Sequence, residues 1–320
     1  MSERRIHEIN VPANLAGMRV DQGLAISFPQ YSRSQIKHWI DAGTVTVNGT
    51  PCRPKDKLVS DDHIEMIATL SASVSLEAQQ IDFNVLFEDE HLLVVDKPAG
   101  IVVHPGAGNL DSTLANGLLF KFPELAALPR AGLIHRLDKE TSGLLVVART
   151  NEAFQRLTSL MSERAIKREY LALCNGIIIA GGKIDQPIGR DPNNRLKMKI
   201  RGDGRTAVTH YRIAEKYRTH TLLDVTLETG RTHQIRVHMA HLGHPIVGDS
   251  RYGARPKLPN KPLADFRDAL SQLDRHVLHA KQLSFTHPFQ VEQIIVNSPI
   301  PSPIASLLQL ARDDINQGNV

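Results

Sequence analysis

Short apolar runs recur through the middle of this 320-residue chain without a regular alternation between strands and helices. Runs of strand length occupy residues 92–95, 144–148, 170–174 and 222–227, whereas residues 151–164 show the apolar spacing of a helix. The sequence has no repeated strand–helix–strand pattern and no Gly-x-Gly-x-x-Gly after a strand, which argues against a doubly wound parallel sheet. We therefore predict an α+β fold with a mixed, largely antiparallel sheet.

Two changes in composition divide the chain. One segment combines a helical apolar face with an alternating stretch that ends in Asn48-Gly49, a pair typical of a tight hairpin turn. The segment that follows it is small and polar without an amphipathic period, as expected of a tether. We predict an N-terminal extension at residues 1–16, a small domain at 17–68, a linker at 69–80 and a large domain at 81–320.

Composition argues against several classes of protein. The apolar content of 41% suits a globular core, and no apolar run approaches the roughly 20 residues of a membrane span. The first residues are polar and lack the apolar core of a signal peptide, so we expect the chain to stay in the cytoplasm, away from membranes. Cys52 and Cys174 form no Cys-x-x-Cys pair, which argues against a disulfide framework and a thiolate metal site.

Positive charge is concentrated in one part of the chain. The formal net charge is only +4, yet residues 190–236 hold eleven Lys or Arg against five Asp or Glu. A strand here would place four basic side chains on one face, where phosphates can bind: Arg195, Lys197, Lys199 and Arg201. An ordinary edge strand guarded by charges explains the same pattern equally well.

The segment His135–Gly143, which reads His-Arg-Leu-Asp-Lys-Glu-Thr-Ser-Gly, places one carboxylate among basic and turn-forming neighbours. We expect a short strand at residues 131–134 and a buried one at 144–148, so Asp138 lies on the loop between them. A rigid loop of this kind is a suitable position for a catalytic carboxylate. The alternative is that Asp138 caps a turn and pairs with a neighbouring base such as Arg136.

This segment resembles the signature of the RluA/RluD-type pseudouridine synthases, which isomerise uridine in RNA. Three further segments resemble motifs of the family in the expected order: Asp96–Gly106, Lys167–Tyr170 and Leu227–His238. Together the likeness covers most of the chain. It implies the same mixed α+β catalytic domain and an isomerase that flips its target nucleotide out of the stack.

The resemblance assigns roles to individual residues. Asp138 is implied to be the catalytic carboxylate, acting as nucleophile or base, with Tyr170 against the target base and Arg231 paired with Asp138. Arg136 is implied to fill the space that the flipped nucleotide leaves. Taken singly, Tyr170 is more simply a core residue, and Arg231 equally fits a surface ion pair. The isomerisation requires no metal or cofactor, and we expect neither.

The small N-terminal domain resembles the αL-type RNA-binding domain. Arg33 and Lys37 fall on the exposed side of its helix at residues 32–40 and are candidate RNA contacts, although a purely structural helix is the alternative. Within the family, the greatest likeness is to members that modify large-subunit ribosomal RNA. It implies a hairpin of that RNA, or the assembling subunit, as partner, without an obligate protein partner.

Two other functions remain open from the sequence. An inactive RNA-binding assembly factor would explain the basic stretch, but not the match at three active-site positions. An RNA glycosidase would cleave the same bond and release free uracil, whereas a synthase leaves the mass of the RNA unchanged. Methyl transfer is disfavoured because the sequence offers no convincing site for a methyl donor.

Overall fold

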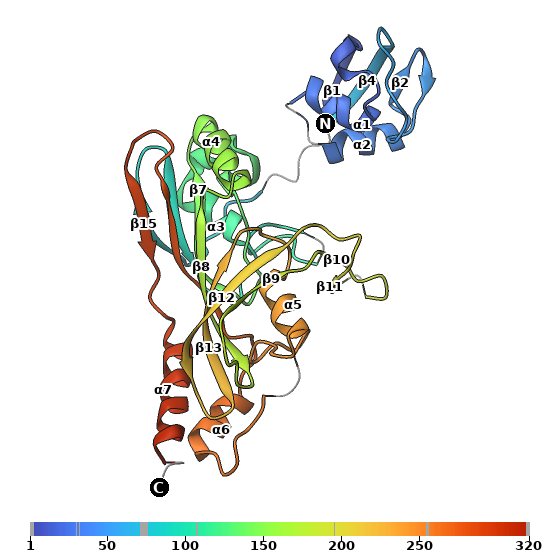
Figure 1. Cartoon of the computed structure of the whole chain (residues 1–320). Coiled ribbons are helices and arrows are strands. Elements are labelled where there is room, and N and C mark those ends of the chain that lie inside the picture. Colours follow the sequence, from blue (N-terminus) through green and yellow to red (C-terminus); the bar gives the residue numbers. More distant parts are fainter. Residues whose placement is uncertain are drawn as a thin grey trace. The chain divides into compact units, whose positions relative to one another are not determined.

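The computed structural model describes residues 3–29, 31, 33–70, 76–106, 108–194, 196–253 and 256–317 (Figure 1). The chain divides into two compact units, Met1–Ser75 and Leu76–Val320, which we describe separately. The predicted linker at residues 69–80 spans this division, although residues 71–75 lie outside the described part. No helix among the described residues is long and apolar enough to cross a membrane.

The first unit packs two helices against a small antiparallel sheet. In spatial order the strands are β1 (Glu3–Asn10), β4 (His63–Leu70), β2 (Val45–Val47) and β3 (Thr50–Pro51), and the helices are α1 (Val20–Ser27) and α2 (Arg33–Asp41). The hairpin predicted at Asn48-Gly49 is present, with both residues at positive φ. β1 pairs with β4 along its whole length, so the predicted extension at residues 1–16 contributes a strand to this unit.

The second unit is built on one large sheet. Its strands follow the spatial order β5 (Asn84–Glu88), β6 (Leu92–Lys97), β7 (Ser142–Ala148), β14 (Leu278–Thr286), β8 (Lys167–Asn175), β13 (His220–Leu227), β12 (Val208–Lys216) and β9 (Gly182–Asp185), with β15 (Gln293–Asn297) also paired to β14 (Figure 1). Among the described strands of this sheet, only β7 and β14 pair in parallel. The predicted mixed, largely antiparallel sheet is confirmed.

Helices and a small ribbon complete the second unit. They are α3 (Leu114–Lys121), the 3-10 turns η2 (Pro123–Ala127) and η3 (Pro129–Gly132), α4 (Asn151–Ser162), α5 (Gln234–His241), α6 (Ala264–Ser271), α7 (Ser302–Gln317), and the ribbon of β10 (Ile188–Arg190) and β11 (Met198–Ile200). Helices cover both faces of the sheet. On β6, Leu93 clusters with Leu118 of α3, whereas Leu92 clusters with Leu157 of α4. This explains why β6 and β7 are apolar throughout rather than alternating.

One predicted strand is wrong. Residues 131–134 were expected to form a strand, but the chain there follows the 3-10 turn η3, and Leu133 makes only an isolated bridge to Val147. Arg130 and Ala131 have φ values of 54° and 52°, which lie in the left-handed region and are incompatible with a strand. The approach to the candidate catalytic loop is therefore a tight turn.

Gly143 in β7 lies beside the carbonyl of Ala280 in β14, where the two strands run parallel. A Cβ at this position would overlap the carbonyl oxygen, and its φ of +112° strains any other residue. We expect Gly143→Ala to lower the free energy of unfolding by about 1–3 kcal/mol, measured by urea denaturation. Gly202→Ala is the control, because no atom lies within 4 Å of the added Cβ. Equal losses in both variants would contradict this prediction.

Candidate active site

Segments that are far apart in the sequence line one cleft of about 770 Å³ in the second unit. They include the loop after β6, the loop before β7, the end of α4, the first half of β8, and the turn between β13 and α5. Four of the predicted site residues line this cleft: Arg136, Asp138, Tyr170 and Arg231. The fold therefore brings together the segments that the family resemblance singled out.

Asp138 is held by an arginine other than the predicted one. Its Oδ2 accepts a 2.9 Å hydrogen bond from Nη1 of Arg236, whereas Oδ1 lies 3.9 Å from Nε2 of His233. The predicted pairing of Arg231 with Asp138 is wrong: Nε of Arg231 donates to the carbonyl of Thr206 instead. The reason is geometric, because α5 starts after Arg231 and carries Arg236 towards the loop of Asp138. One carboxylate oxygen is thus fixed and the other is available for chemistry.

Arg236 also pairs with a second carboxylate. Its Nε and Nη2 donate to Asp249 at 2.8 and 2.9 Å, and the Asp249 side chain is fully buried. Burial opposes the charge of Arg236, but the hydrogen bonds of Asp249 and the charge of Asp138 outweigh it and raise the pKa of the guanidinium. Arg236 stays charged, its planar group is held by the two bonds to Asp249, and it orients Asp138 through the single bond from Nη1.

The loop that carries Asp138 is tied to the rest of the unit on both sides. Nζ of Lys97, a fully buried residue, donates to the carbonyl of Lys139 at 3.0 Å, and Oγ1 of Thr141 hydrogen-bonds Nε2 of His276 at 2.8 Å. The backbone N–H of Thr141 donates to the carbonyl of Asp138. These bonds give the loop the rigidity that a catalytic constellation requires.

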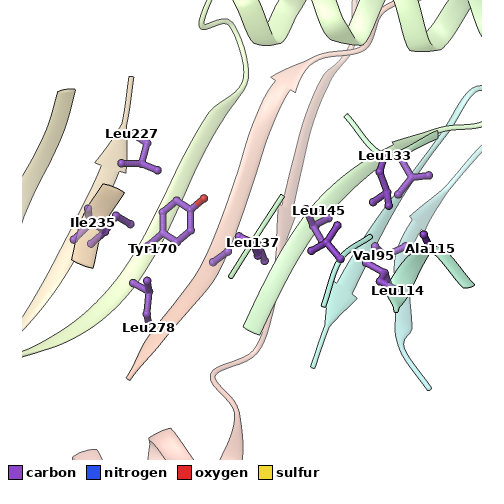
Figure 2. Packing of buried hydrophobic residues seen from close by; sticks show 14 of the residues in the cluster. Val95, Leu114, Ala115, Leu133, Leu137, Leu145, Tyr170, Leu227, Ile235 and Leu278 are labelled. Atoms are coloured by element: carbon purple, nitrogen blue, oxygen red, sulfur yellow. The ribbon is translucent and has the colours of Figure 1, made fainter. Parts of the chain in front are cut away.

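Tyr170 presents a protonated phenol to the cleft. Its side chain packs among Leu227, Ile235 and Leu278, as Figure 2 shows, and the residue is only 5% exposed. Burial raises the pKa of its hydroxyl, while the nearby charge of Arg168 partly opposes this effect. At neutral pH the hydroxyl is protonated, so it can accept a proton only if its own is removed.

The predicted RNA contacts differ in their surroundings. In the first unit, Arg33 is half-exposed and pairs at 2.6 Å with the buried Asp21, whereas Lys37 is exposed on the same helix. In the second unit, Arg136 is exposed at the cleft. Arg33 therefore has a structural partner as well as an accessible charge.

The basic strand predicted at residues 195–201 is shorter than expected. Arg195 lies outside the described residues, and Lys197 belongs to a turn that precedes β11, where its N–H donates to Asn194. Lys199 is exposed on β11, and Arg201 pairs with Asp203 at 2.6 Å after the strand ends. The single face of four basic side chains is therefore not formed as predicted.

Two histidines, His135 and His238, make structural hydrogen bonds in or near the cleft. Nε2 of His135 accepts a hydrogen bond from the N–H of Val146, which requires an unprotonated nitrogen, and His238 hydrogen-bonds Thr209 and the carbonyl of Gln186. Within the described ranges, no group of three or more His, Cys, Asp or Glu side chains is arranged to hold a metal.

Three histidines of the second unit make stability depend on pH. Desolvation lowers the pKa of His135 to about 3 and that of His220 and His276 to about 4. The unfolded chain therefore binds more protons between about pH 4 and 6.5, so stability present at neutral pH is lost as the pH falls through this window. We expect His276→Gln, which can still bond Thr141, to lose less stability than the wild type between pH 7 and 4.5. Equal losses in urea denaturation would contradict this.

The cleft is strongly cationic. Among the described residues that line it, two are carboxylates and six are arginines. The arginines are Arg130, Arg136, Arg164, Arg168, Arg231 and Arg236. Both carboxylates have partners, because Asp138 is bonded to Arg236 and Glu228 is bonded to Arg164 at 2.9 Å and to His210 at 2.6 Å. A cleft with this charge favours a polyanionic ligand.

The RNA pseudouridylate synthase model matches residues 91–241, which include Asp138, Tyr170 and Arg236. Ribosomal large subunit pseudouridine synthase D of Xanthomonas campestris pv. campestris is 49% identical over 304 residues, covering 95% of this chain and 92% of that relative. The chain belongs to the RNA pseudouridylate synthase family. The Escherichia coli K12 protein of the same name is 45% identical over 318 residues, covering 99% of this chain and 98% of that relative.

One further family model and two solved structures are also similar to this chain. The S4 domain model matches residues 18–64 of the first unit. Among solved structures, Human RNA Pseudouridylate Synthase Domain Containing 4 has a TM-score of 0.57 and 25% identity, covering 72% of this chain and 93% of that one. Human RNA Pseudouridylate Synthase Domain Containing 1 has a TM-score of 0.54 and 26% identity, covering 72% and 95%. The family resemblance and the predicted isomerase class are confirmed.

Sequence reasoning about this pseudouridine synthase missed Arg236 and Asp249. Arg236 stands five residues after Arg231 in the same motif, and the two can be told apart only if the start of α5 is known. Asp249 lies in a short turn with no periodic pattern, so the sequence carried no signal for its contact with Arg236. Arg168 lies in the Lys167–Tyr170 segment, but the family resemblance implied no role for it.

Proposed function

We propose that this synthase converts uridine to pseudouridine at defined sites of large-subunit ribosomal RNA, with Asp138 as the catalytic carboxylate. The observation that carries the proposal is the geometry of Asp138, which is oriented by Arg236 through one oxygen and faces the cationic cleft. The names of the relatives support large-subunit ribosomal RNA as the substrate, since both are called ribosomal large subunit pseudouridine synthase D.

The remaining residues of the cleft have distinct proposed roles. The ring of Tyr170, which lines the cleft, lies against the detached base. Arg136, which is exposed, occupies the position that the flipped nucleotide leaves in the RNA and offsets part of the unstacking cost of a few kcal/mol. Arg231 contacts the substrate from the opposite segment of the cleft, rather than acting through Asp138.

Basic residues outside the cleft extend the proposed RNA contact. They are the exposed Arg33 and Lys37 on α2, the half-buried Lys197 before β11, and the exposed Lys199 on β11. The target is a hairpin of the ribosomal RNA or of the assembling subunit in the cytoplasm, and no obligate protein partner is involved. No metal or cofactor is required, because the rearrangement has no redox step and transfers no external group.

The test uses purified protein with unmodified large-subunit ribosomal RNA and, separately, small-subunit ribosomal RNA. Pseudouridine is mapped by carbodiimide modification and primer extension. Stops at defined uridines of the large-subunit RNA are expected, without free uracil in the supernatant. Release of free uracil would indicate a glycosidase. Tight binding without stops, on naked RNA and on precursor subunits, would favour the assembly-factor alternative.

A further inference from the structure

Arg168 is a buried cation at the cleft. It lies two residues before Tyr170 on β8, so both side chains are on the same face of the strand. The residue is only 5% exposed, yet it lines the cleft. Its guanidinium occupies the space beside Gly230, where an added Cβ would lie 2.6 Å from Nη1. The absence of a side chain at Gly230 thus makes room for the charge.

Among the described residues, no carboxylate forms an ion pair with Arg168. Its Nε is buried without a hydrogen-bond partner, and across the described ranges the guanidinium has no ion pair. Arg236 in the same cleft is the opposite case, since two carboxylates bind it. A buried guanidinium without a partner destabilises the folded chain, so its retention at a cleft points to a ligand that supplies the missing acceptor.

The surroundings of Arg168 favour an anionic ligand at this position, because Arg164 and Arg231 line the same cleft. Burial lowers the pKa of Arg231, as do the like charges of Arg205 and Arg164. The charge of Arg168 adds to the desolvation that keeps His135 unprotonated. This wall of the cleft therefore has a positive potential that only an anion relieves.

We propose that Arg168 binds a backbone phosphate of the substrate RNA next to the nucleotide whose base lies against Tyr170. Neighbouring positions on one face of β8 let a single nucleotide contact both side chains, the base at Tyr170 and a phosphate at Arg168. The forked guanidinium suits a phosphate with two acceptor oxygens. This inference rests on the proposed action on RNA, and it adds the group that sets the position of the target nucleotide.

The experiment compares Arg168→Met with the wild type on an RNA fragment that surrounds a uridine mapped as modified by the wild type. The dissociation constant is measured as a function of salt concentration, together with the melting temperature of the RNA-free protein. Arg267→Met is the matched control, because Arg267 is exposed on α6 and pairs only with Asp268 among the described residues, so the net charge changes equally.

We expect Arg168→Met to bind the fragment about tenfold or more weakly, with the slope of log affinity against log salt reduced by roughly 0.7 for the lost phosphate contact. Its melting temperature should stay the same or rise, because an unpaired buried charge has been removed. Arg168→Lys should retain the salt slope. A lower melting temperature with an unchanged salt slope would overturn the proposal, since it would make Arg168 a structural residue.

A second measurement needs no mutation and avoids any effect on folding. Single uncharged methylphosphonates are placed at the phosphates on either side of the target uridine, and binding to the wild type is measured. One position should weaken binding to the wild type about tenfold and have little further effect on Arg168→Met. Equal effects on both proteins at every position would refute the contact. Failure of the wild type to form pseudouridine would instead refute the proposed function.

Discussion

Asp138→Asn is expected to reduce pseudouridine formation by at least about three orders of magnitude. The amide is nearly equal in size to the carboxylate, but it is uncharged and cannot act as nucleophile or base. Arg236 keeps its two bonds to Asp249, so the fold of the site should survive. The measurement is the single-turnover rate on large-subunit ribosomal RNA.

Binding of RNA separates a chemical role of Asp138 from a structural one. Removal of a negative charge from an arginine-lined cleft should leave the dissociation constant unchanged or slightly lower. Asp268→Asn is the control, since Asp268 is half-exposed on α6 and its partner is the exposed Arg267. Wild-type turnover by Asp138→Asn would overturn the assignment, as would a loss of turnover that only follows a loss of RNA binding.

Arg236→Gln is expected to lower both stability and activity. The substitution leaves the fully buried Asp249 without its cation, which should lower the free energy of unfolding by about 3–5 kcal/mol. It also frees Asp138 from its 2.9 Å bond, and the loss of orientation should slow the single-turnover rate about 100-fold or more. Urea denaturation and the same pseudouridine assay measure the two effects.

Two further variants test the charge network around Arg236. Adding Asp249→Asn to Arg236→Gln removes the unpaired carboxylate, so stability should recover in part while activity stays low. Arg231→Gln removes one hydrogen bond to the carbonyl of Thr206, so it should lower stability by less than about 1 kcal/mol and leave Asp138 oriented. If Arg231→Gln slows the chemical step more than Arg236→Gln does, Arg231 is the partner of Asp138 during catalysis.

Local patterns explain which parts of the structure could be predicted. The hairpin at Asn48-Gly49 and the strands β6, β7 and β13 follow from turn chemistry and short apolar runs, both of which depend on adjacent residues. The prediction of a strand at residues 131–134 was wrong because the left-handed backbone at Arg130 cannot be inferred from the apolar residues that follow it. The prediction of a basic face at residues 195–201 was wrong because the alternation of basic and apolar residues extends beyond the three residues of β11.

The sequence of this synthase was sufficient to identify the family, the sheet type and the loop of Asp138, because these depend on motifs and on periodicity within short segments. Only the tertiary structure showed that Arg236 pairs with Asp138 and Asp249, and that Nε of Arg168 is buried without a hydrogen-bond partner among the described residues. Asp138 and Arg236 are 98 residues apart in the chain. Their contact depends on how α5 packs against the sheet. Without that packing, the sequence cannot show which arginine of the motif contacts Asp138.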